Sequence, residues 1–125
     1  MRRIVGPLVF VAAAVVLAGA TPAARAESGA DLFNDNCVVC HSTEPGIQKL
    51  GPSLAGVVGR KSASLPDYPY SPAMTRAGLV WTKPVLEKYL AKPQAMVPGT
   101  KMTFPGLKSA KERAALVGYL ATLKN

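Results

Sequence analysis

The sequence predicts an all-α domain with three main helices joined by long loops. Three segments carry a capping residue followed by apolar residues at helical spacing, and no segment alternates long enough to predict a strand. The loops are dense in turn-forming residues, because the 125 residues include eleven glycines and eleven prolines. Two cysteines can form at most one disulfide, which cannot stabilise so much irregular chain. The fold therefore needs some other central element to organise its loops.

The first expected helix begins after Ser28 and continues to about Cys40. Ser28 and Asp31 have the spacing of a capping box, in which the serine caps the helix and the acid bonds back to the cap. Leu32 and Phe33 follow and begin its apolar face.

The second expected helix follows an irregular stretch, Ser42 to Val80, that is rich in Gly, Pro and Ser and that we expect to wrap around the domain. Thr82 caps this helix, and Pro84 lies in the first turn, where proline is tolerated. Pro93 ends it. Its apolar stripe consists of Val85, Leu86, Tyr89 and Leu90.

The third expected helix follows a second loop, Gln94 to Lys108. Ser109 and Glu112 repeat the capping-box spacing at its start. Its apolar residues recur at helical spacing and are Leu116, Tyr119, Leu120 and Leu123.

The N-terminal segment has the order of a secretory signal peptide. Arg2 and Arg3 give a positive start, Ile4 to Ala20 is apolar throughout, and Ala24-Arg25-Ala26 is a small-x-small cleavage site. We therefore expect residues 1–26 to be removed as a leader.

The mature domain would then cover residues 27–125, beginning at Glu27, in an exported protein. The alternative is a retained membrane anchor. The apolar run has 17 residues and contains Gly6 and Pro7, whereas a membrane span needs about 20. If the leader is cleaved, we expect no stable membrane insertion.

The charge of the chain is positive but dispersed. The formal net charge is +8, and the mature domain keeps twelve basic and seven acidic residues, a net charge of +5. Such a charge favours steering toward an acidic partner. No Lys/Arg run is present, so we expect no nucleic-acid partner.

The two cysteines belong to the run Cys37-Val38-Val39-Cys40-His41, the attachment pattern of a c-type haem. Cysteines three residues apart share one face of a helix, so both thiols can add to the two vinyl groups of one porphyrin. His41 then supplies an imidazole nitrogen to the iron. We therefore expect one covalent haem c, held through Cys37 and Cys40.

Other interpretations of this run fit less well. A thioredoxin-like redox pair needs a βαβ context, and a zinc site needs four ligands, whereas His41 is the only histidine. A structural disulfide would not need the adjoining histidine.

A second axial ligand has to come from another residue type. Methionine is the usual partner in electron-transfer cytochromes c, and four are present: Met1, Met74, Met96 and Met102. Met1 leaves with the leader. Proline and glycine bracket Met102 and stiffen its loop, which favours it modestly over Met96.

Nearly the whole mature chain resembles the class I cytochromes c, the mitochondrial type and its small soluble bacterial relatives. The matching pieces are Gly29-x-x-x-Phe33, Cys37-x-x-Cys40-His41, Gly51-Pro52-Ser53-Leu54-x-Gly56, Gly59-Arg60-Lys61, Tyr70-Ser71, Trp81, Tyr89-Leu90, Pro98-Gly99-Thr100-Lys101-Met102 and Leu116-x-x-Tyr119-Leu120. The resemblance implies the class I fold, with three main helices and long loops wrapped around one covalent haem.

The resemblance also implies roles for single residues. Met102 becomes the distal ligand, and the Pro52 carbonyl accepts the outer N–H of His41, which fixes the ring. Tyr89 should lie near the Met102 sulfur, and Phe104 should shield the haem face.

The haem propionates need partners as well, because an unpaired buried charge is costly. The resemblance assigns their hydrogen bonds to Tyr70, Trp81 and Thr100, with Arg60 close by. It also packs the first helix across the last, with Gly29 and Phe33 near Gly118 and Tyr119.

Three positions depart from the mitochondrial pattern. Met74 stands where that subfamily often has an asparagine near a propionate, and a thioether accepts hydrogen bonds only weakly. Gln94 and Ala95 stand where mitochondrial proteins carry docking lysines. The docking patch is therefore expected to be thinner.

The function implied is that of a soluble, monomeric one-electron carrier in the periplasm. Its partners would be larger redox proteins that dock transiently at the haem edge, and the resemblance places Lys49, Lys101, Lys108 and Lys111 near that edge. Two alternatives belong to other classes. A haem subunit fixed in a membrane complex would keep the apolar run Ile4 to Ala20 as an anchor. A peroxidase-like enzyme would need an open sixth site and a distal acid–base residue.

Overall fold

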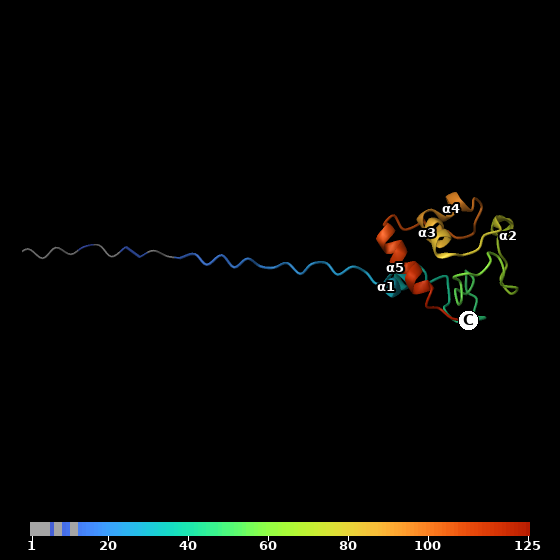
Figure 1. Ribbon diagram of the computed structural model, residues 1–125, viewed down its shortest axis with the longest axis horizontal. Coiled ribbons are helices and arrows are strands. Elements are labelled where there is room, and N and C mark those ends of the chain that lie inside the picture. Colours follow the sequence, from blue (N-terminus) through green and yellow to red (C-terminus); the bar gives the residue numbers. More distant parts are fainter. Residues whose placement is uncertain (1–5, 7–8, 11–12) are drawn as a thin grey trace, which may run out of the picture.

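The computed structural model describes residue 6, residues 9–10 and residues 13–125. Residues 13–27 run away from the folded body as an extended tail (Figure 1). The remainder of the expected leader, residues 1–5, 7–8 and 11–12, lies outside the described residues. Within the described part of the chain, no helix is long and apolar enough to cross a membrane.

The described residues form five helices around the interior. They are α1 (Gly29–Asn36), α2 (Pro72–Ala77), α3 (Lys83–Ala91), α4 (Pro93–Met96) and α5 (Ala110–Leu120). Over the described residues the backbone forms no strand, and a single β-bridge joins Lys61 to Val80. The expected all-α class is confirmed.

The first helix is shorter than expected. α1 has the full capping box, in which the Ser28 side chain accepts a hydrogen bond from the Asp31 N–H and the Asp31 side chain accepts from the Ser28 N–H. The helix ends at Asn36, because Cys37 leaves helical geometry with φ −120° and ψ −36°. The prediction that it continues to Cys40 is therefore wrong by one turn.

A turn replaces that last stretch of helix. The amides of Cys40 and His41 both donate to the Cys37 carbonyl, at 3.0 and 2.8 Å. The cysteines therefore still lie one turn apart, but on a turn rather than on a helix. Val38 and Val39 lie between them, and their β-branched side chains favour leaving the helix.

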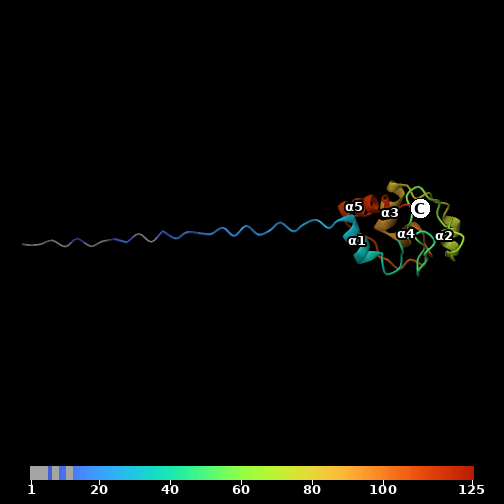
Figure 2. The ribbon, with the colours of Figure 1, turned by 90° about the horizontal axis from the view of Figure 1, so that it is seen from below.

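α1 packs across α5, and Figures 1 and 2 show these two helices side by side from perpendicular directions. A Cβ added at Gly29 would collide with the Ala115 carbonyl, so only glycine allows this approach. Phe33 and Tyr119 meet with ring centroids 5.4 Å apart. Gly118 does not belong to the contact, because an added Cβ there meets nothing within 4 Å.

α3 packs on the other side of α5 and begins and ends close to the expected positions. The Thr82 side chain accepts from the Val85 N–H, and Pro84 lies in the first turn. α5 starts with the Ser109 side chain accepting from the Glu112 N–H. The buried side chains of the two helices belong to one apolar core and are Leu86, Tyr89, Leu90, Leu116, Val117 and Leu120.

The two short helices lie in segments expected to be loops. α2 has six residues and α4 has four, too few for a period of 3.6 to be recognised. Both begin with proline, which is preorganised for a first helical position. α4 carries the chain from α3 into the loop that holds Met102.

Candidate haem site

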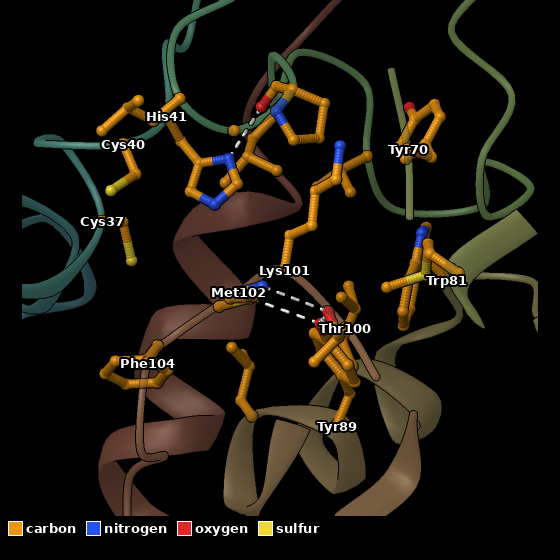
Figure 3. A pocket seen from close by; sticks show the side chains of 18 of the residues that line it. Cys37, Cys40, His41, Tyr70, Trp81, Tyr89, Thr100, Lys101, Met102 and Phe104 are labelled. Atoms are coloured by element: carbon orange, nitrogen blue, oxygen red, sulfur yellow. Dashed lines mark hydrogen bonds between the residues drawn. The ribbon is translucent and has the colours of Figure 1, made fainter. Parts of the chain in front are cut away.

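A cavity of about 540 Å³ lies between α3, α5 and the loops around residues 50–60 and 100–105, a volume in the range of cofactor pockets. Figure 3 shows labelled side chains from α3, from the Cys37–His41 segment and from residues 100–104 around it. All ten residues predicted for the site line this cavity: Cys37, Cys40, His41, Pro52, Arg60, Tyr70, Trp81, Tyr89, Thr100 and Met102.

The two cysteine thiols face the cavity together, Cys37 buried and Cys40 half-buried. Burial, with a smaller effect of Cys40, raises the pKa of the Cys37 thiol to about 11. A thioredoxin-like pair requires a lowered thiol pKa, so this site does not favour dithiol redox chemistry. Its geometry suits two thioether bonds to one flat cofactor.

The imidazole of His41 presents one free nitrogen to the cavity. Its Nδ1 lies 2.7 Å from the Pro52 carbonyl oxygen, which can only accept, so Nδ1 carries the proton and Nε2 keeps its lone pair. Burial lowers the pKa of His41 against the opposing effect of this bond, and the charges of Arg60 and Lys49 lower it further. A neutral, oriented imidazole is the form that binds iron.

The loop that supplies Pro52 is held from both sides. The Arg60 guanidinium donates through Nη1 to the Ala55 carbonyl at 2.9 Å and through Nη2 to the Ser53 carbonyl at 2.8 Å. The Gly51 N–H donates to the Cys40 carbonyl at 2.7 Å. Arg60 thus lines the cavity and also stiffens the loop behind His41.

The Met102 sulfur lies within a small polar group on another wall. The Tyr89 hydroxyl donates to Met102 Sδ at 3.4 Å and lies 3.5 Å from the Thr100 hydroxyl oxygen. The Met102 N–H donates to that same Thr100 oxygen at 3.3 Å. Burial raises the pKa of Tyr89, which keeps its hydroxyl protonated as a donor. Figure 3 shows His41 and Met102 reaching in from different segments.

The other methionines are placed differently. Met96 lines a separate cavity beside Lys88 and Lys108 and does not line the one that contains His41. Met74, on α2, does line the His41 cavity, but Tyr89 donates to Met102. The structure therefore favours Met102 over Met96 more strongly than the sequence does.

Two aromatic residues, Tyr70 and Trp81, lie on the side of the cavity away from the cysteines, whereas Phe104 lies on the same side as Cys37 (Figure 3). The Trp81 and Tyr89 rings pack with centroids 4.9 Å apart, and Trp81 is buried. The Tyr70 hydroxyl accepts from the Leu65 N–H at 3.3 Å. Polar groups at this end could bind propionates.

Two of the four expected docking lysines tie loops together at the cavity. Lys49 Nζ donates to the Val38 carbonyl, and Lys101 Nζ donates to the Pro69 carbonyl at 2.6 Å. Lys108 and Lys111 are exposed near and at the start of α5.

Comparison with known proteins identifies this arrangement. The model of the cytochrome c family matches residues 26–124. The chain belongs to the cytochrome c family. It is thus an electron-transfer protein with one covalent haem c and a class I cytochrome c fold, and proteins of this family dock with redox partners.

Several cytochromes c are similar over most of their length. Cytochrome c2 from Rhodopila globiformis is 47% identical over 106 residues, which are 85% of this chain and all of the relative. Cytochrome c from Euglena viridis is 44% identical, covering 80% of this chain and 98% of the relative. The structure of cytochrome cH from Methylobacterium extorquens superposes with a TM-score of 0.71 at 39% identity, covering 75% of this chain and 94% of that one.

Two residues matter more than the sequence indicated. A Cβ added at Gly51 would collide with the His41 ring, so this glycine allows the histidine to pack flat against the loop. The sequence signal for the role of Gly51 was its position directly before Pro52. Gln94, noted only as a missing lysine, donates to the Met102 carbonyl. No periodicity or motif indicates such a side-chain-to-backbone bond.

Proposed function

We propose that this cytochrome c is a soluble, monomeric periplasmic carrier of single electrons, with His41 and Met102 as the two axial ligands. The observation that carries the proposal is the convergence of a neutral His41 imidazole and the Met102 thioether on the cavity that both cysteines line. When bound, haem c supplies an iron that alternates between the ferrous and ferric states.

The residues of the chain would tune and protect that iron. Pro52 holds the proton on His41 Nδ1, so Nε2 stays available as a ligand. Tyr89 donates to the Met102 sulfur and helps to orient it. With His41 and Met102 both bound to the iron, no position would remain for a substrate, which suits a carrier. The apolar lining excludes water, and methionine ligation raises the reduction potential.

Tyr70, Trp81 and Thr100 are proposed to bind the propionates, with Arg60 close by. The support is their common position on the lining of one cavity. Arg60 already makes two hydrogen bonds to carbonyls, so we expect it to act on the propionates mainly through its charge.

Residues 1–26 are proposed to be a signal peptide, and residues 27–125 the mature domain. The support is the positive start, the apolar run and the cleavage site. The first helix begins at Gly29, so cleavage before Glu27 would leave the fold intact.

The partners are proposed to be larger redox proteins that meet the haem edge through Lys49, Lys101, Lys108 and Lys111. Charge complementarity speeds such encounters. Lys49 and Lys101 are tied to loops at the cavity, which would hold their charges near the exposed edge.

The intact mass of the denatured protein, purified from an exporting host, tests attachment and processing together. We expect the mass of residues 27–125 plus one haem. A mass equal to the bare polypeptide would contradict covalent attachment. A mass that includes residues 1–26 would contradict cleavage and favour a membrane-held subunit. Replacing Cys37 or Cys40 with alanine should lower the yield of holoprotein.

A further inference from the structure

The loop that carries Met102 has few backbone hydrogen bonds. Residues 102–109 adopt no regular structure. The loop is held at its ends, where the Thr100 N–H donates to the Val97 carbonyl at 3.0 Å and the Leu107 N–H donates to the Leu90 carbonyl at 2.8 Å. Between these two bonds, residues 101–106 form no hydrogen bond with another backbone group of the described chain. Side chains must therefore hold the middle of the loop.

Gln94 holds two carbonyls of this stretch. Its Nε2 donates to the Met102 carbonyl at 2.5 Å and to the Phe104 carbonyl at 3.1 Å. A primary amide has two N–H donors, one for each carbonyl. The flipped amide would place its oxygen against two other oxygens, so the partners determine its orientation.

The base of this bridge is firmly placed. Gln94 follows Pro93, whose side chain is fully buried, and both belong to the single turn of α4. The Val97 N–H closes that turn by donating to the Pro93 carbonyl at 2.9 Å. The side chain of Gln94 is exposed, so it can be replaced without opening the core.

We propose that Gln94 is a positioning residue that keeps the Met102 loop closed, and thereby keeps the thioether on the iron. It acts through the backbone of Met102 and Phe104 and does not itself line the haem cavity. The inference rests on the proposed ligation of the iron by Met102. Where mitochondrial proteins carry a docking lysine, this chain has a glutamine that binds the backbone of the Met102 loop instead.

Imidazole binding to the ferric holoprotein at one fixed pH measures how often the loop opens. Added imidazole can bind the iron only where Met102 has left it, so the apparent affinity rises in proportion to the open fraction. Gln94→Ala should bind imidazole about three- to tenfold more tightly, because exposed hydrogen bonds contribute modestly.

Two further variants separate the donor from mere packing. Gln94→Glu has nearly the same shape but cannot donate when ionised, and it would face two carbonyl oxygens, so its imidazole affinity should rise at least as much as that of the alanine variant. Gln94→Lys restores N–H donors and should return the affinity close to that of the wild type. Thr122→Ala removes a remote bond of the same kind, from Thr122 Oγ1 to the Tyr119 carbonyl at 2.6 Å, and should leave the affinity unchanged.

The possible failures can be told apart. A wild-type ferric protein without the weak far-red absorption band of a sulfur–iron bond would overturn both the ligation by Met102 and the role of Gln94. If the band is present and Gln94→Ala binds imidazole as the wild type does, only the role of Gln94 is wrong. Equal affinities of the alanine and lysine variants would also overturn it.

Discussion

The haem cavity has two walls, the segment around His41 and Pro52 (the His41 wall) and the loop around Met102 (the Met102 wall). Different interactions stabilise them. On the His41 wall, the imidazole bonds to the Pro52 carbonyl, and Arg60 holds the carbonyls that follow. On the Met102 wall, an eight-residue stretch lacks regular structure and is held largely by side chains: Gln94 binds the Met102 and Phe104 carbonyls, and Arg113 binds the Leu107 and Lys108 carbonyls. The comparison indicates that the ligand next to the covalent attachment is held by bonds to a tightly bonded loop, whereas the distal ligand lies on a stretch without regular structure.

Removing the haem should have the largest effect, because the cofactor would fill the cavity that both walls line. The cavity separates α3 and α5 from the loops of both walls, and the long middle segment has little apolar periodicity of its own. The haem-free protein should be largely disordered. Thermal unfolding followed by circular dichroism should show no cooperative transition. A cooperative transition would mean that the hydrogen bonds of the His41 wall suffice to hold a fold.

Replacing Gly51 with alanine should have the second-largest effect, because it disturbs the packing around His41 directly. The added methyl group would collide with the His41 ring, and such overpacking typically costs about 1–3 kcal/mol of unfolding free energy. Denaturant unfolding of the holoprotein measures the change. Gly118→Ala is the matched control: nothing lies within 4 Å of the added Cβ, and an exposed helical glycine should gain about 0.5–1 kcal/mol on the same change. Equal effects at the two sites would contradict the packing argument.

The sequence predicted the His41 wall better than the Met102 wall. The spacing of Cys37, Cys40 and His41 predicted their chemistry, and the resemblance to class I cytochromes c implied the bond to Pro52. The capping residues Ser28, Thr82 and Ser109 marked the starts of the main helices. The end of α1 was missed because the turn at Cys37 depends on backbone angles that the motif does not report. The bond from Gln94 to the Met102 loop was missed because it joins positions that only the folded chain brings together.

Salt dependence of the electron-transfer rate should show which wall faces the partner. Steering raises association rates by about 10- to 1,000-fold in strongly charged cases and is screened over about 8–10 Å at ordinary ionic strength. Reversing the charge of Lys101 or Lys108, on or after the Met102 loop, should slow the second-order rate with an acidic partner several-fold at low salt. Reversing that of Lys49 reports on the His41 wall.

Lys124, near the C-terminus, is the control and should leave the rate unchanged. With Gln94 and Ala95 in place of lysines, the slope against salt should be shallower than for a mitochondrial cytochrome c. An electron-transfer rate that is the same at low and high salt would contradict the role of these lysines in docking. It would not affect the proposed carrier function.

The weak far-red band of the ferric holoprotein tests the central claim, that His41 and Met102 hold the iron from unequal walls. The account predicts the band in the wild type, its loss in Met102→Ala together with a fall in the reduction potential, and its retention in Met96→Ala, because Met96 lines a different cavity. Loss of the band in Met96→Ala and its retention in Met102→Ala would contradict the account.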